Sequence, residues 1–355
     1  MPSVKVESST GKTDFKYTIS TPANASAKSI DKNLPTVLFI PAVYLQRDVF
    51  HLQFGDHKLR RFNLVTFDLR GHGETTGDKI PSNYGQEESA EDVVKLMEAL
   101  KLPACHIVGM SLGSVIALQM AITYPDKVAS LFLISSLGLE EPDYVAAARS
   151  EIYDYWTQGF GDATSSKIDG TALLDALYGV MQFAFSNKTT SLTTAYATRF
   201  LPLAKENWGP KDFDVFRTAT VDFFTKRKTY SKEALQSIAQ RGIRMKLVHG
   251  LDDITYRLEY SVEQEKMFRD AGIDVTLAKV NHAPHFVVGD YGKEVNHILH
   301  DFLLECIKPI GKPVPAIPLA DSVVSPWDAR LREAGWTPED ISDDEDEEEE
   351  LIVTA

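Results

Sequence analysis

Short, largely apolar runs alternate along the chain with longer segments of helical periodicity. Each run is as short and as apolar as a strand buried on both faces of a sheet requires. Strands that alternate with helices in this way predict an α/β fold, a mostly parallel, doubly wound sheet covered by helices on both faces. The predicted strands are residues 36–40, 63–67, 105–108, 131–134, 245–248 and 275–280, and the predicted helices are residues 87–100, 112–124, 258–271 and 295–307.

The alternation is interrupted once, by a segment without a predicted strand. Residues 139–241 contain many aromatic side chains, Trp156 and Trp208 among them, but no apolar run typical of a buried strand. We therefore expect a helical cap inserted between two strands of the sheet. The cap would divide the core into residues 1–138 and residues 242–308.

The last part of the chain differs from the rest in composition. Residues 309–355 begin rich in proline and end in the acidic run DDEDEEEE, a composition that buries too little apolar surface to offset the entropy of ordering. This tail is expected to be largely mobile, with a short helix over residues 327–335 as a candidate to dock on the body. Residues 321–355 hold thirteen Asp and Glu against two Arg, so they carry −11 of the net charge of −14, and the remaining body, residues 1–320, carries −3.

The charge of the body bears on the class of partner. A body without excess positive charge is a poor match for a phosphate backbone, so a small-molecule substrate is expected rather than nucleic acid. No segment approaches the ~20 apolar residues of a membrane span, and residues 1–21 lack the apolar stretch of a signal peptide. We expect a cytoplasmic location and no membrane partner. Cys105 and Cys306 suggest neither a disulfide nor a metal site, and no cofactor is predicted.

The pentapeptide Gly109-Met110-Ser111-Leu112-Gly113 lies directly after a predicted buried strand and directly before a predicted helix. A chain that turns abruptly from strand to helix strains its central residue, and small residues two positions away on either side avoid a clash. Ser111 would then project at the carboxyl edge of the sheet, where a helix N-terminus stabilises negative charge. The alternative is a serine that only caps the helix. The strand before it and the helix after it favour a nucleophile.

A serine hydroxyl is a weak nucleophile at neutral pH, so it needs a base from elsewhere in the chain. His282 and His285 follow the last predicted strand, in a loop that would reach the same edge of the sheet. We favour His285 as the base and interpret His282 as a residue that packs the loop.

An acid that orients the base is expected after the preceding strand, where the sequence reads HGLDD at residues 249–253. The G-x-x-D spacing favours Asp253 and leaves Asp252 as a turn or capping residue. A remoter alternative places the acid after the fourth predicted strand, at Glu140 or Glu141.

Over residues 34–308 the chain resembles the α/β-hydrolase superfamily. The resemblance rests on the GMSLG pentapeptide, on the chain order Ser, Asp, His of the candidate residues, and on the run FDLRGHGET at residues 67–75. This run is similar to the D-x-R-G-H-G-x-S loop of the family. His72 within it is interpreted as structural rather than catalytic.

The resemblance also implies that two backbone N–H groups bind the oxyanion of the intermediate, one from Leu112 and one from the loop after the first parallel strand. Members of the family commonly carry His-Gly in that loop, whereas this sequence has PAVY at residues 41–44. Because Pro41 has no N–H, Val43 is the candidate for the second donor and Ala42 is the next.

Together these residues predict acyl transfer. His285 takes the proton of Ser111, which attacks an ester, thioester or lactone carbonyl, and water releases the acyl-enzyme. The aromatic cap favours a small to medium apolar substrate, unless its rings only pack the core of the cap. Two other hypotheses stay open. One is a non-catalytic ligand-binding or scaffold protein on the same fold, in which the altered loop at residues 41–44 would mark a lost oxyanion hole. The other is a carbon–carbon bond hydrolase that uses the same three residues.

Overall fold

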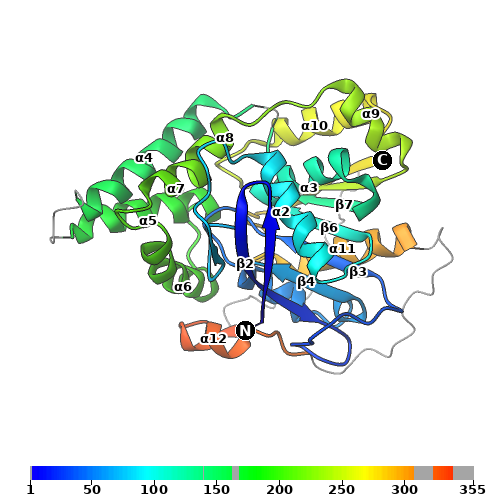
Figure 1. Cartoon of the computed structure of the whole chain (residues 1–355), viewed down its shortest axis with the longest axis horizontal. Helices are drawn as coiled ribbons and strands as arrows, with labels where there is room; N and C mark the ends of the chain where they lie inside the picture. Colours follow the sequence, from blue (N-terminus) through cyan, green and yellow to red (C-terminus); the bar gives the residue numbers. More distant parts are fainter. Residues whose placement is uncertain (1, 139, 162–167, 308–322, 339–355) are drawn as a thin grey trace.

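A nine-stranded sheet lies at the centre of the computed structural model, which describes residues 2–138, 140–161, 168–307 and 323–338 (Figure 1). The strands are β1 (Ser3–Ser8), β2 (Gly11–Ser20), β3 (Thr36–Ile40), β4 (Asn63–Phe67), β5 (Thr76–Gly77), β6 (Cys105–Met110), β7 (Val128–Ile134), β8 (Arg244–Gly250) and β9 (Val275–Val280). Their order is β1-β2-β4-β3-β6-β7-β8-β9, and β5 pairs with β2. The strands from β4 to β9 along this order pair in parallel, whereas β2 pairs antiparallel with β1, β4 and β5. Each predicted apolar run lies within one of the parallel strands.

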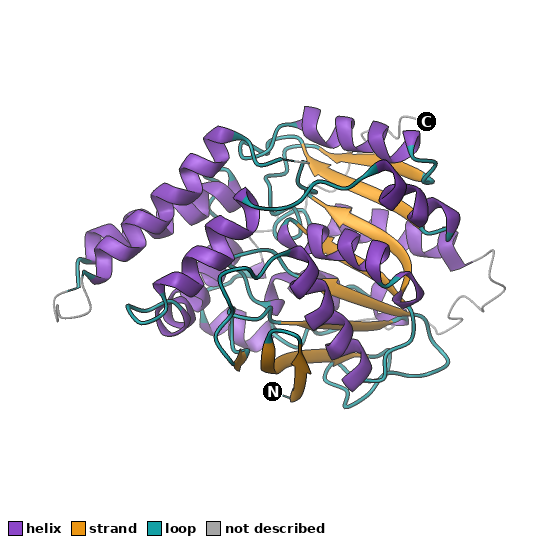
Figure 2. Ribbon diagram, turned by 45° about the horizontal axis from the view of Figure 1, so that its top comes forward, coloured by secondary structure: helices purple, strands orange, loops and turns teal. Residues whose placement is uncertain are grey.

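Helices cover both faces of the sheet (Figure 2). Along β3, Leu38 and Ile40 point into one hydrophobic core, and Val37 and Phe39 point into the other. Alternate residues of a strand face opposite sides, so a run that is apolar at every position fits a sheet with two covered faces. The first core lies beneath α2 (Gln86–Ala99), α3 (Leu112–Thr123) and α10 (Leu258–Asp270), and the second beneath α1 (His51–Phe54) and α11 (Gly292–Ile307).

A helical insertion between β7 and β8 forms a cap at one side of the molecule. Its elements are α4 (Asp143–Phe160), α5 (Gly170–Phe185), α6 (Ser191–Asn207), α7 (Phe213–Arg217), the π-helical turn η4 (Thr218–Asp222) and α8 (Phe223–Thr225). In Figure 1, α4 and α5 lie against each other and project away from the sheet. The following helix, α9 (Lys232–Gln240), packs against α3 of the core. The expected fold class, a mostly parallel sheet with an inserted helical cap, is confirmed.

The C-terminal segment 323–338 packs on the body near the cap (Figure 1). It contains α12 (Asp328–Glu333), which lies within residues 327–335, where the sequence suggests a short helix that docks on the body. This helix contacts α6. Trp327 and Trp336 are almost fully buried, in the core beneath α1 and α11. The other residues of the tail that is expected to be mobile lie outside the described residues.

Three further observations concern the described residues alone. Cys105 and Cys306 are buried and free. No helix that the structure describes is both long and apolar enough to cross a bilayer. Within the same residues, no cluster of three or more His, Cys, Asp and Glu side chains could bind a metal ion.

Candidate active site

Ser111 occupies the turn between β6 and α3, at the carboxyl edge of the parallel sheet. Its φ of 52° and ψ of −112° lie outside the regions that residues other than glycine ordinarily adopt, so the backbone is strained as expected. A Cβ on Gly109 would lie 2.4 Å from the carbonyl oxygen of Gly113, and a Cβ on Gly113 would lie 2.2 Å from that of Ile40. Glycine at both positions therefore allows the turn. The second contact also brings the loop after β3 close to Ser111.

His285 and Asp253 reach Ser111 from the loops after β9 and β8. The Nε2 atom of His285 lies 2.9 Å from the Oγ of Ser111, and its Nδ1 atom lies 2.6 Å from the Oδ2 of Asp253. The N–H groups of Thr255 and Tyr256 both donate to the Oδ1 of Asp253, at 2.8 Å. A carboxylate facing Nδ1 keeps a proton on that nitrogen and leaves Nε2 free to accept one from the hydroxyl. The structure thus brings together the three residues that the sequence favours.

The residues considered as alternatives lie elsewhere. The side chain of His282 is 81% exposed. Asp252 points outward and pairs with Lys188 at 2.9 Å. Glu140 is exposed, and Glu141 is buried in a cluster of charged residues next to the cap. The structure brings none of these alternatives to Ser111.

The run FDLRGHGET builds a loop held by buried polar contacts. Asp68 accepts a hydrogen bond from the backbone N–H of Arg47 at 2.8 Å, and Arg70 donates to the hydroxyl of Thr10 at 2.7 Å. The Nδ1 of His72 lies 3.2 Å from the carbonyl oxygen of Arg70, to which it donates. Burial lowers the pKa of His72 to about 4. The ring is therefore neutral at physiological pH and serves the loop.

The candidate oxyanion donors are available. The N–H of Leu112 is the first of α3, and the first N–H groups of a helix have no partner within it. Among the described residues, no acceptor binds the N–H of Val43 or of Ala42. The geometry therefore leaves both residues of this loop available as the second donor. Because Ile40 touches Gly113, the loop lies beside the turn at Ser111.

The site is closed in this arrangement. Ser111 and His285 are fully buried. The ring centroids of Tyr256, Phe286 and Phe183 lie 5.0, 5.2 and 5.7 Å from that of the imidazole. In this arrangement neither the side chain of Ser111 nor that of His285 is accessible to solvent.

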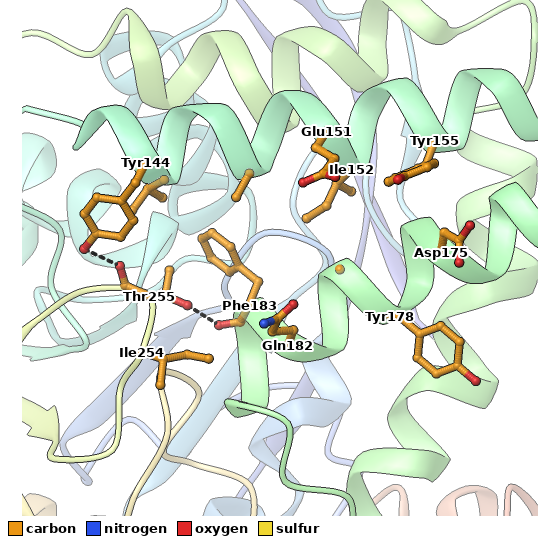
Figure 3. A pocket seen from close by; sticks show the side chains of 13 residues that line it. Tyr144, Glu151, Ile152, Tyr155, Asp175, Tyr178, Gln182, Phe183, Ile254 and Thr255 are labelled. Carbon is orange, nitrogen blue, oxygen red and sulfur yellow. Dashed lines mark hydrogen bonds between the residues drawn. The ribbon is translucent and has the colours of Figure 1, made fainter.

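A cavity of about 430 Å³ opens between α4 and α5, and its lining includes Tyr144, Tyr178, Ile254 and Phe183 (Figure 3). Phe183 contacts both the cavity and the candidate base, since it lines the cavity and packs edge-on against His285. The hydroxyl of Tyr144 donates to the carbonyl of Thr255 at 2.9 Å, and the hydroxyl of Thr255 donates to the carbonyl of Phe183 at 2.7 Å. These bonds tie the cap to the loop that carries the candidate acid.

The aromatic side chains of the cap divide between the two roles considered for them. Trp156, Trp208 and Phe224 are buried in the hydrophobic core that the cap shares with one face of the sheet. Tyr155 and Tyr178 instead line the cavity between α4 and α5. Neither the packing role nor the pocket role therefore accounts for all of these residues.

Sequence reasoning missed Arg149, which is completely buried in the interior of the cap. Its Nε donates to Glu141 at 2.6 Å and its Nη2 donates to the hydroxyl of Tyr256 at 3.0 Å. A signal was present in the sequence. Arg149 is spaced helically between Val145 and Ile152, so it lies on the apolar face of α4, where a charged residue is unexpected.

Comparisons with known proteins agree with this fold. The profile of the family described as alpha/beta hydrolase fold matches residues 35–244. A thermophilic esterase from Thermogutta terrifontis superposes with a TM-score of 0.64 at 15% identity, over 86% of this chain and 99% of that chain. The enol-lactonase from Burkholderia xenovorans LB400 superposes with a TM-score of 0.61 at 15% identity, over 85% of this chain and 100% of that chain. At this identity the likeness concerns the fold alone.

Curated relatives match over a shorter stretch. The protein named "Putative carbamate hydrolase RutD" from Caulobacter vibrioides is 37% identical over 84 residues, which are 24% of this chain and 30% of that protein. The protein of the same name from Variovorax paradoxus is 36% identical over 73 residues, 21% of this chain and 27% of that protein. The matched stretch is less than a third of the length of these relatives.

Proposed function

Because this chain belongs to the alpha/beta hydrolase family, we propose that it is a serine hydrolase with Ser111 as nucleophile, His285 as base and Asp253 as the residue that orients the base. One observation carries the proposal. A continuous series of hydrogen bonds runs from the Oγ of Ser111 through both nitrogens of the imidazole to the carboxylate. This series moves a proton from the hydroxyl to the imidazole and holds the resulting imidazolium against a buried carboxylate.

The proposed reaction is acyl transfer in two steps. Ser111 attacks an ester, thioester or lactone carbonyl while the Nε2 of His285 takes its proton. The N–H groups of Leu112 and Val43 bind the oxyanion, and the imidazolium then protonates the leaving group. Water attacks the acyl-enzyme by the same sequence and releases the acid.

We further propose a small to medium substrate with a largely apolar body. The rings around His285 support this, because apolar side chains line most pockets for such ligands. The structural neighbours described as an esterase and an enol-lactonase support an ester or lactone as the bond that is cleaved.

A non-catalytic binding protein on the same fold is the competing function, and the altered loop at residues 41–44 is the feature that favours it. The unpaired N–H groups of Ala42 and Val43 beside the turn at Ser111 support the enzyme instead. A carbon–carbon bond hydrolase with the same three residues is separated from an esterase by product analysis on a p-nitrophenyl ester and on a β-diketone.

A fluorophosphonate probe tests the proposal, because it reacts with an activated serine. We expect the full-length protein to be labelled and Ser111→Ala to remain unlabelled. Ser150→Ala is the matched control, since the hydroxyl of Ser150 only donates to a carbonyl of its own helix. Absence of labelling in the folded wild type would favour the binding protein.

A further inference from the structure

Arg149 is a charged side chain in the buried interior of the cap. It lies on the face of α4 that also carries Ile152 and Trp156, and it is completely buried. Its guanidinium carbon lies 3.3 Å from the ring centroid of Phe224 and 4.4 Å from that of Phe183. A cation buried among aromatic rings has lost its hydration and needs compensation by charge or by hydrogen bonds.

The charges around Arg149 do not cancel within their own cluster. Glu141 accepts hydrogen bonds from Arg149 and from Arg227, each at 2.6 Å, and from the hydroxyl of Tyr256 at 2.8 Å. Burial opposes ionisation of Glu141, but the two guanidinium groups hold its pKa below the ordinary value, so it is a carboxylate. Two cations and one anion leave one unit of positive charge. The buried carboxylate of Asp253 is engaged by the imidazole and by backbone N–H groups of its own loop.

The cluster also has more donors than acceptors. A guanidinium has five N–H groups to satisfy. The Nη1 of Arg149 donates to the carbonyl of Thr220 at 3.5 Å, which is long for a hydrogen bond. The hydroxyl of Tyr44 is fully buried, and the side chains of Arg149 and Thr220 lie close enough to lower its pKa, but neither meets the distance and angle of a hydrogen bond to it. Burial raises the pKa of Tyr44, so this hydroxyl keeps its proton and can donate. A buried hydroxyl without a partner is costly, and a ligand that supplies an acceptor would remove the cost.

The cluster borders the candidate active site. Tyr44 directly follows Val43, the candidate oxyanion donor, in the loop after β3. Tyr256 lies three residues after Asp253, and its ring centroid is 5.0 Å from that of His285. One of the free donors, the hydroxyl of Tyr44, therefore comes from the loop that carries the candidate oxyanion donor, and Tyr256 connects the cluster to the loop of the orienting acid.

We propose that Arg149 and the hydroxyl of Tyr44 bind a carboxylate of the substrate, so that the preferred substrates are esters or lactones with a free carboxylate near the scissile bond. This inference rests on the proposed function and narrows its substrate class. One unit of excess charge matches a monoanion, and a planar guanidinium beside a hydroxyl matches the two oxygens of a carboxylate. Phe183 and Phe224 then contact the hydrocarbon part of the substrate.

Selectivity between two esters tests this role. The p-nitrophenyl monoester of glutaric acid is compared with p-nitrophenyl pentanoate, which has the same chain length without the carboxylate. We expect the wild type to prefer the anionic ester in kcat/KM, and Arg149→Met to lower that preference about 10- to 100-fold. Arg257→Met is the matched control, because it removes an exposed cation next to Tyr256 and should leave the preference unchanged.

The same measurement separates substrate binding from a purely structural role. If Arg149 only held the cap together, Arg149→Met would lower kcat/KM for both esters by the same factor, and the inference would be overturned. A wild type without any preference for the anionic ester would overturn it as well.

A binding measurement covers the case in which Arg149→Met does not fold. Full-length Ser111→Ala is titrated with monomethyl glutarate and with dimethyl glutarate in a calorimeter. We expect the monoanion to bind at least about 10-fold more tightly, and Arg149→Lys in the same background to reduce this difference, because lysine keeps the charge but loses the planar fork. Equal affinities would refute the carboxylate site. Failure of the fluorophosphonate probe would instead refute the proposed function and leave this titration interpretable.

Discussion

Asp252 and Asp253 are adjacent in sequence but have different environments. Asp252 points outward, where its hydrogen bond from Lys188 lowers the pKa of its carboxyl group. Asp253 points inward, and both of its oxygens are engaged, one by His285 and the other by two backbone N–H groups. Neighbouring residues of a loop face opposite directions here, so only one of the two carboxylates can hold the imidazole.

We therefore predict unequal effects when each aspartate is replaced by asparagine. Asp253→Asn should lower kcat on a p-nitrophenyl ester by roughly 10³- to 10⁴-fold, because an amide no longer fixes the tautomer of His285 or stabilises the imidazolium. Asp252→Asn should change kcat by less than about twofold, since an exposed ion pair contributes little. Equal losses in the two variants would contradict the assignment of the acid.

At the scale of elements, the strands could be predicted closely from the sequence. Three predicted runs, residues 36–40, 63–67 and 275–280, coincide with β3, β4 and β9. A strand buried on both faces is apolar throughout, so its pattern does not depend on knowing its neighbours. The residues Ser, Asp and His could be found for a related reason, because they follow strands whose carboxyl ends meet at one edge of the sheet.

The interior of the cap could not be predicted in the same way. Its helices bury faces against one another, and tertiary contacts decide which faces these are. The cluster of Arg149 shows the difficulty, because Glu141, Arg227 and Tyr256 come from separate parts of the chain. No spacing along the sequence connects these residues, so only the folded structure reveals the excess charge.

The C-terminal segment 323–338 yields a prediction at this scale. The ring of Trp327 lies 4.9 Å from that of Phe54, and the ring of Trp336 lies 4.3 Å from that of His51. Truncation after Ile307 removes both indoles and should lower the free energy of unfolding by several kcal/mol, at about 1.5–3 kcal/mol for each large buried side chain. Urea unfolding followed by circular dichroism measures this loss.

A second truncation is the control for the first. Truncation after Pro338 keeps both tryptophans and removes ten of the thirteen acidic residues of 321–355. We expect it to leave both the urea midpoint and esterase activity nearly unchanged. If it destabilised the protein as much as the longer truncation does, the docking of Trp327 and Trp336 could not be the cause.

At the scale of the whole molecule, stability is linked to pH through buried histidines. Burial lowers the pKa of both His51 and His72 to about 4. In the unfolded chain these histidines titrate near the ordinary value of about 6.5. Between these values the unfolded state binds protons that the folded state does not, so stability falls as the pH falls from about 6.5 toward 4. The stability that the neutral rings of His51 and His72 contribute is fully present above about pH 6.5.

His51 offers the test of this linkage, because its ring packs against Trp336 and a phenyl ring can replace it. At pH 5, a histidine with a pKa of about 4 when folded and about 6.5 when unfolded costs about 2 kcal/mol of stability relative to pH 7.5. His51→Phe should therefore lose about 2 kcal/mol less than the wild type when urea unfolding at pH 7.5 is compared with pH 5. His57→Asn, at an exposed histidine of the same region, should show the full loss of the wild type. Identical losses in all three proteins would mean that His51 is protonated in the folded state at pH 5, against the direction that its burial requires.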